Sequence, residues 1–222
     1  MTDDALSQLQ QQMIEIIAAH AVLAREQIGR ETLDERVLKA MARVPRHQFV
    51  PVEFTAYAYA DHPLPIGFDK TMSQPFIIAL MTDLLDIQPT DTVLEIGTGL
   101  GYHAAILAEL AAHVYTVEIV EELALQAERR LEPMGYTNIE ARVGNGQYGW
   151  PQNAPFEKIL VCAASELIPA PLISQLKPGG RMIVPTGIPD AQSLLLVTKN
   201  GDGKIATKEV LPVRFALLET GS

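Results

Sequence analysis

The sequence predicts an α/β protein built on a doubly wound, mostly parallel sheet of seven strands, with a helical extension at its N-terminus. Three observations predict this fold. Short apolar runs alternate with helical segments after about residue 90, a glycine-rich turn follows the first run, and an Asn-Gly-Asp-Gly turn separates two late runs. Alternating strands and helices are typical of a parallel sheet that is covered on both faces.

The length of 222 residues, with 48% hydrophobic and 20% charged residues, is that of one globular domain with a substantial core. We expect residues 1–222 to form a single domain. Within it, residues 1–75 form a helical and loop extension, and residues 76–222 form a Rossmann-like core.

The formal net charge of −10 opposes binding to a phosphate backbone, so a nucleic-acid partner is not expected. No apolar run approaches the roughly 18–20 residues that span a bilayer, so we expect no membrane segment. A single cysteine excludes an internal disulfide, and the acidic start lacks the positive charge of a secretory signal. These features predict a cytoplasmic protein. They leave the oligomeric state undetermined, with a monomer as the expected form.

The N-terminal segment carries apolar residues at helical spacing over residues 5–30, which predicts a first helix. Asp34 is placed as the cap of a second helix. Prolines at 45, 51, 63 and 65 then indicate an irregular region that ends near Ser73, before a helix over 76–85. Because this region is too long for a simple connection, we expect it to be a binding loop.

The remaining apolar runs predict the seven strands of the sheet. They cover residues 92–96, 113–117, 138–143, 158–162, 181–184, 193–197 and 209–215. Helical spacing over 102–110 and 121–131 fills two of the connections. The turn at residues 200–203 predicts that the last two strands pair antiparallel at the sheet edge.

The strongest functional signal is the turn Gly97-Thr98-Gly99-Leu100-Gly101, which joins a strand directly to a helix. Glycines let the chain turn sharply and leave room for a nucleotide-like ligand at the carboxyl end of the strand. A dinucleotide fingerprint would place its third glycine at Tyr102, so the spacing disfavours an NAD-dependent dehydrogenase.

Two carboxylates flank this turn. Glu95 lies two residues before it, and Glu118 ends the next strand, where an acidic side chain can accept the ribose hydroxyls of an adenosine. Adenosylmethionine has no pyrophosphate but carries a cationic sulfonium and an ammonium group, so it suits this arrangement. The alternative is a tight structural turn with Glu118 merely exposed.

Several motifs resemble those of the protein-L-isoaspartate O-methyltransferases. Residues 65–75, Pro-Ile-Gly-Phe-Asp-Lys-Thr-Met-Ser-Gln-Pro, resemble that family's P-I-G-x-x-x-T-[IM]-S-x-P segment. Residues 44–50 are similar to its V-P-R-x-x-F-V, residues 154–159 to its A-P-F-D-x-I, and residues 175–180 to its Q-L-x-x-G-G. The motifs occur in the family's order and extend over nearly the whole chain.

The resemblance implies methyl transfer from S-adenosyl-L-methionine to the free carboxylate of L-isoaspartyl residues in damaged proteins or peptides. The ester can collapse to a succinimide, which gives the chain a route back to aspartate. Ser73 matches the family's active-site serine, and the extension 1–75 would form part of the active site. The matching cofactor-site residues are Glu95, Gly97, Thr98, Gly99, Gly101, Glu118, Asn145 and Gly146. The matching substrate-site residues are Pro65, Ile66, Thr71 and Ala216.

The implied chemistry needs few catalytic groups. A carboxylate with a pKa near 4 is already ionised at neutral pH, so alignment of the reacting atoms and exclusion of water suffice, without a general base. Ser73 has a second interpretation as the cap of the helix that follows Pro75.

Some residues depart from the family pattern. Asn145 stands where an aspartate is usual, Leu100 where a small Ser or Thr is usual, and Lys70 where Gln is common. Residues 214–218, Arg-Phe-Ala-Leu-Leu, differ from the family's R-F-V-P-L. These departures leave two alternatives open: a carboxyl O-methyltransferase acting on a different peptide or small acid, and a non-catalytic protein that binds the cofactor.

The sequence predicts no metal site. Its five histidines show no paired ligand spacing, and Cys162, at the end of an apolar strand, is interpreted as a core residue.

Overall fold

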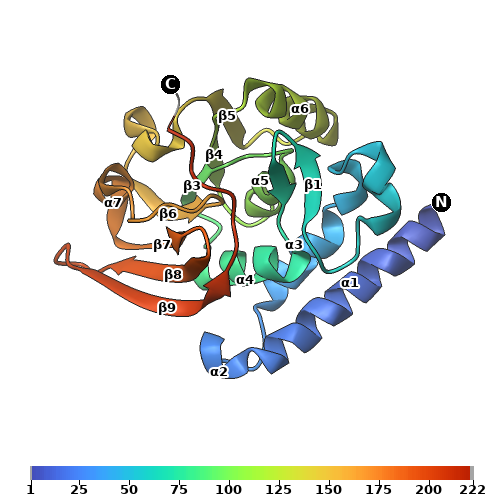
Figure 1. Ribbon diagram of the computed structural model, residues 1–222, viewed down its shortest axis with the longest axis horizontal. Helices are drawn as coiled ribbons and strands as arrows, with labels where there is room; N and C mark the ends of the chain where they lie inside the picture. The colour runs from blue at the N-terminus through green and yellow to red at the C-terminus, as the bar shows by residue number, and fades with distance from the viewer. Residues whose placement is uncertain (1, 221–222) are drawn as a thin grey trace.

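The computed structural model describes residues 2–220 and places a seven-stranded sheet at the centre of the molecule (Figure 1). The strands are β3 (Thr92–Ile96), β4 (His113–Glu118), β5 (Ile139–Val143), β6 (Phe156–Val161), β7 (Leu176–Ile188), β8 (Ala191–Lys199) and β9 (Ile205–Val213). Their spatial order is β5-β4-β3-β6-β7-β8-β9. The first five in this order pair parallel, and β8 and β9 pair antiparallel at the edge. The predicted doubly wound sheet and its antiparallel edge are confirmed.

Helices cover both faces of the sheet. The α-helices are α1 (Asp3–Leu23), α2 (Arg25–Ile28), α3 (Glu35–Arg43), α4 (Pro75–Leu85), α5 (Tyr102–Ala108), α6 (Glu121–Leu131) and α7 (Ala170–Gln175). Short 3-10 helices are η1 (Arg46–Gln48), η2 (Val52–Tyr57), η3 (Glu132–Met134), η4 (Gly146–Tyr148) and η5 (Pro151–Asn153). None of the helices within residues 2–220 is both long and apolar enough to cross a membrane.

The two faces of the sheet carry separate apolar cores, because successive residues of a strand point to opposite sides. On β6, Leu160 packs into the core beneath α1, α3, α4, α5 and α6, whereas Ile159 and Val161 pack into the core that includes Leu172 of α7. On β3, Val93 faces the first core and Leu94 the second. Glu95 therefore shares a sheet face with α4 and α5.

The N-terminal extension packs onto the first of these cores. Met13 and Ile17 of α1 are fully buried, and α1 contacts both α3 and α4. The expected cap of α3 is confirmed, since the Asp34 side chain accepts a hydrogen bond from the Arg36 amide. The predicted first helix is instead divided at Ala24 into α1 and α2.

The proline-rich region contains a two-stranded sheet that the sequence does not predict. Strands β1 (Leu64–Gly67) and β2 (Lys70–Met72) form an antiparallel hairpin. The turn residues Phe68 and Asp69 have φ angles of 54° and 55°, which two-residue hairpin turns require but non-glycine residues rarely adopt. Strands of four and three residues are too short to show a clear alternation of apolar and polar residues, which is why the sequence predicts an irregular region here.

Candidate active site

A cavity of about 510 Å³ opens at the carboxyl ends of β3, β4 and β6, where parallel sheets commonly bind ligands. The glycine turn after β3 lines it, together with the β1–β2 hairpin and the C-terminal segment. The predicted site residues that line this cavity are Ile66, Thr71, Ser73, Gly97, Thr98, Gly99, Glu118, Gly146 and Ala216. The structure therefore gathers most of the expected site from five separate parts of the chain.

Four expected site residues do not line the cavity. Pro65 is exposed on β1, and Gly101 is the N-cap of α5, where an added Cβ would lie 3.1 Å from the Leu131 side chain of α6. The Asn145 side chain accepts from the Gln147 amide and donates to the Thr220 carbonyl. Glu95 lies beneath the turn in the interior. Any contribution of these residues to ligand binding is indirect in this conformation.

The turn after β3 has three glycines with positive φ angles, and two of them, Gly97 and Gly99, line the cavity. Gly97 and Gly99 have φ angles of 92° and 56°, a region that side chains with a Cβ rarely adopt. At Gly97 an added Cβ would also lie 3.3 Å from the Cβ of Cys162. The turn thus brings backbone atoms up to the cavity without side chains to fill it.

The Glu118 carboxylate holds the glycine turn in place through hydrogen bonds to backbone amides. One carboxylate oxygen accepts the Gly99 amide at 2.8 Å, and the other accepts the amides of Ile119 at 2.9 Å and Val120 at 3.0 Å. The side chain lines the cavity and is nearly buried. Hydrogen bonds to an ionised acceptor are about twice as strong as neutral ones. The interpretation of Glu118 as a merely exposed residue is wrong.

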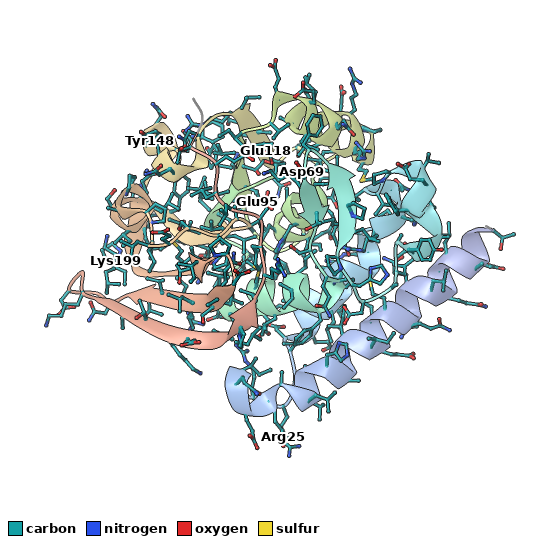
Figure 2. The ribbon with its side chains drawn as sticks, viewed as in Figure 1. Arg25, Asp69, Glu95, Glu118, Tyr148 and Lys199 are labelled. Atoms are coloured by element: carbon teal, nitrogen blue, oxygen red, sulfur yellow. The ribbon has the colours of Figure 1, made fainter. Side chains whose placement is uncertain are left out.

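Glu95, which is labelled in Figure 2, is fully buried and hydrogen-bonded to a pair of threonine hydroxyls. It accepts a hydrogen bond from Thr116 Oγ1 at 2.6 Å, and Thr116 Oγ1 lies 2.5 Å from Thr98 Oγ1. Burial raises the pKa of Glu95 to about 8, so the carboxyl group is largely protonated at neutral pH. Of the two predicted carboxylates, Glu118 is the one that lines the cavity.

Ser73 enters the cavity wall just before α4. The structural N-cap of α4 is Gln74, and Asp61 accepts the Phe76 amide at 2.8 Å in place of a serine cap. The helix-cap interpretation of Ser73 is therefore wrong. Within residues 2–220 no group hydrogen-bonds the Ser73 hydroxyl, while the Ser73 carbonyl accepts from Arg46 Nη2 at 2.8 Å. The hydroxyl remains available to a ligand.

Arg46 is a functional candidate that the residue pattern did not single out. Its guanidinium is fully buried, donates to the carbonyls of Ala58 and Ser73, and lies 4.9 Å from the centre of the Tyr102 ring. It thereby fixes the backbone that carries Ser73. The Val-Pro-Arg motif at 44–46 was the available signal for this role.

The end of the chain closes one side of the cavity. The red C-terminal segment runs back across the sheet toward β5 in Figure 1. The Leu218 amide donates to Ala164 O at 2.7 Å, and the Ala164 amide donates to Ala216 O at 2.8 Å. Lys70 of the hairpin forms an ion pair with Glu219. Both charged residues line the cavity.

The departures from the resembled motifs therefore lie close to one another. Lys70 contacts Glu219, Asn145 donates to the Thr220 carbonyl, and Leu100 lines the same cavity. Lys70 and Asn145, which depart from the resembled motifs, both contact the C-terminal segment at Glu219 and Thr220. Residues 214–218 of that segment also depart from the resembled motif.

The sequence of the chain matches a known family model over residues 18–222, that of protein-L-isoaspartate(D-aspartate) O-methyltransferase (PCMT). The chain belongs to the PCMT family. A PCMT relative from Polaromonas sp., named protein-L-isoaspartate O-methyltransferase 1, is 59% identical over 219 residues, which are 99% of this chain and 93% of the relative. A relative from Syntrophobacter fumaroxidans, named protein-L-isoaspartate O-methyltransferase 2, is 50% identical over 99% of this chain and 89% of its own length.

Solved PCMT structures share the fold. A protein-L-isoaspartate O-methyltransferase with 27% sequence identity superposes with a TM-score of 0.79 over 94% of this chain, which spans 65% of that longer chain. A PCMT structure from Plasmodium falciparum, in complex with S-adenosyl-L-homocysteine, has a TM-score of 0.76 at 21% identity and covers 96% of this chain and 99% of its own.

The loop after β5 offers two glycines for a matched comparison: Gly146, which lines the cavity, and Gly144, two residues earlier in the chain. In Gly146→Ala the new Cβ would lie 2.3 Å from Ile96 Cγ2, a branch of a stiff side chain that lines the cavity. In Gly144→Ala the nearest atom would be 3.8 Å away. We expect Gly146→Ala to lower the free energy of unfolding by about 1–3 kcal/mol and Gly144→Ala to change it by less than about 1 kcal/mol. Urea denaturation measures both; equal losses would contradict the packing at Gly146.

Proposed function

We propose that this PCMT family member transfers a methyl group from S-adenosyl-L-methionine to the free carboxylate of L-isoaspartyl residues in damaged proteins and peptides. The observation that carries the proposal is the placement of an unpartnered serine hydroxyl, Ser73, and a glycine turn fastened by Glu118 in the walls of one cavity. Family membership and the relatives named for this activity support the reaction and its substrate class.

The cavity fits a sulfonium nucleoside. Gly97, Gly99 and Gly146 present backbone without side chains, and Glu118 provides an acceptor that can meet the ribose hydroxyls. Ile96 and Leu123 add apolar lining. When bound, S-adenosyl-L-methionine supplies an activated methyl group on its sulfur. We assign Gly97, Thr98, Gly99, Glu118 and Gly146 to direct cofactor contact. Glu95, Gly101 and Asn145 act by supporting the turns that make these contacts.

The substrate side of the cavity is formed by the extension and the C-terminal segment. The Ser73 hydroxyl can donate to the substrate carboxylate and hold one of its oxygens, while Arg46 keeps the Ser73 backbone in place. Ile66, Thr71 and Ala216 line the same wall and are assigned to substrate contact. Since the acceptor carboxylate is already ionised, these residues act by orienting it and excluding water. Pro65 faces outward and is assigned a structural role in the hairpin.

The substrate assignment is tested with two peptides that differ only in an isoaspartyl or a normal aspartyl linkage, each incubated with methyl-labelled cofactor. We expect base-labile label on the isoaspartyl peptide alone. Label on neither peptide, with cofactor still bound, would refute the substrate assignment and favour an acceptor of different structure or a non-catalytic binding protein.

Ser73→Ala removes the hydroxyl that is free to meet the substrate. Because a hydrogen bond to a charged group contributes about 1.5–3 kcal/mol, we expect kcat/KM for the isoaspartyl peptide to fall by roughly 10- to 150-fold. The affinity for S-adenosyl-L-homocysteine, measured by calorimetry, should stay within about twofold, since the side chain acts on the substrate. Ser174→Ala, at an exposed serine of α7, is the control. A comparable loss of cofactor affinity in Ser73→Ala would remove the serine from its substrate role.

Glu118→Ala removes both the ribose acceptor and the partner of the Gly99 amide. We expect the affinity for S-adenosyl-L-homocysteine to fall by at least about 10-fold. Glu140→Ala, at an exposed glutamate of the neighbouring strand β5, is the control. Both affinities are compared well below the melting temperature of each variant. Unchanged binding in a folded Glu118→Ala would take Glu118 out of the cofactor site.

A further inference from the structure

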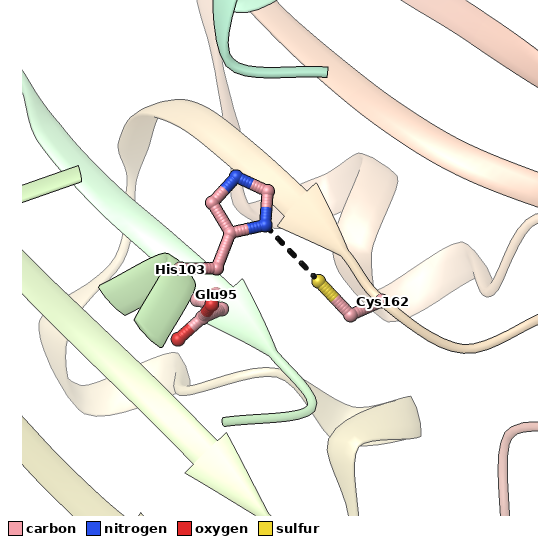
Figure 3. Close-up of side chains that lie close together, drawn as sticks. All are labelled: Glu95, His103 and Cys162. Carbon is pink, nitrogen blue, oxygen red and sulfur yellow. Dashed lines mark hydrogen bonds between the residues drawn. The ribbon is translucent and has the colours of Figure 1, made fainter. Parts of the chain in front are cut away.

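Beneath the glycine turn, three side chains with metal-binding atoms meet. Glu95 comes from β3, His103 from α5 and Cys162 from the residue after β6, and one ligand atom of each lies within 4.8 Å of the others (Figure 3). Within residues 2–220 this is the one group of at least three such residues. His103 and Cys162 line the cavity, and Glu95 lies behind them.

The hydrogen bonds of His103 define which ring nitrogen carries the lone pair. Thr82 Oγ1 lies 2.8 Å from the Ile78 carbonyl, to which it must donate its proton. The same hydroxyl lies 2.9 Å from His103 Nε2 and therefore accepts the Nε2 proton. In the neutral ring, Nδ1 then carries a lone pair, and it lies 3.8 Å from Cys162 Sγ. A histidine whose second nitrogen is fixed in this way is oriented like the histidines of metal sites.

Glu95 gives an independent indication of a missing partner. Its Oε2 accepts from Thr116, but Oε1 is buried and has no hydrogen-bond partner among residues 2–220. An unpaired buried oxygen of this kind is destabilising, because it has lost its hydrogen bonds to water and gained none in the protein. The hydrogen bond between the Cys162 thiol and His103 Nδ1 leaves this destabilisation in place, because it does not involve Glu95.

A divalent cation would satisfy all three groups. Thiolate, imidazole and carboxylate are the donors that Zn²⁺ prefers, and a tetrahedral ion with bonds of about 2.0–2.3 Å holds its ligand atoms roughly 3.3–3.8 Å apart. The sulfur and Nδ1 are already at 3.8 Å, so the carboxylate is the group that must move closer. Binding of the ion would release one proton from Cys162 and one from Glu95, and the resulting thiolate and carboxylate would neutralise the divalent charge in this buried place.

We propose that Glu95, His103 and Cys162 form a three-ligand site for a divalent transition metal of the Zn²⁺ class. Because His103 and Cys162 line the cavity, the ion enters through it and directs its remaining coordination position toward it. The site stands on these three side chains and does not depend on the proposed methyl transfer.

The test uses Co²⁺ as a spectroscopic probe for the full chain after dialysis against a chelator. We expect one equivalent of Co²⁺ to produce the near-ultraviolet thiolate-to-cobalt charge-transfer band and the visible bands of four-coordinate cobalt. Cys162 is the single cysteine of the chain, so the thiolate band identifies its ligand without ambiguity. Zn²⁺ should displace Co²⁺ and abolish both sets of bands. No thiolate band at saturating Co²⁺ in the wild-type chain would overturn the proposal.

Two ligand variants and one control variant test whether Cys162 and His103 bind the metal. Cys162→Ser should lose the charge-transfer band, and His103→Gln should weaken Co²⁺ binding by at least about 10-fold. His62→Gln changes an exposed histidine outside the cluster and should bind Co²⁺ like the wild type. Thermal melting of each variant confirms that it is folded. Equal affinity in folded His103→Gln and wild type would refute the site. Because no cofactor or peptide is present, this outcome is independent of the activity assay.

Discussion

The site depends on one interaction, the acceptance of three backbone amides by the carboxylate of Glu118. These amides belong to Gly99, Ile119 and Val120, so a single side chain joins the turn after β3 to the turn after β4. The two strands are neighbours in a parallel sheet, and their carboxyl ends meet at one edge. A charged acceptor with several backbone donors holds this irregular backbone without filling the cavity with side chains.

The other walls of the cavity come from outside the parallel core. The β1–β2 hairpin and the C-terminal segment meet across the cavity through the Lys70–Glu219 ion pair. Asn145 also contacts the C-terminal segment, through the Thr220 carbonyl. The residues that depart from the resembled motifs therefore gather around the segment that borders the proposed substrate side. An exposed ion pair contributes little stability, about 0–1 kcal/mol, so this border can be remodelled at small cost.

The buried polar groups beneath the turn form the proposed metal site at the same edge of the sheet. Glu95 faces α4 and α5 because alternate residues of β3 point to opposite faces. Its neighbours on that side, Thr116 and His103, are polar in a region otherwise filled by apolar side chains. The cavity that is proposed to hold the nucleoside thus borders a thiol, an imidazole and a carboxyl group, the three kinds of donor of the proposed metal site.

The sequence by itself determined the parallel sheet, its antiparallel edge, the glycine turn and the family, because apolar periodicity and short motifs are local properties of the chain. It placed Ser73, Gly97 and Glu118 near a common site, and the structure brings them to one cavity. Only the tertiary structure decided that Glu95 is buried behind the turn and that Cys162, 59 residues from His103 in the chain, lies beside it. Such contacts arise from strand order and helix packing, which the spacing of residues along a sequence does not encode.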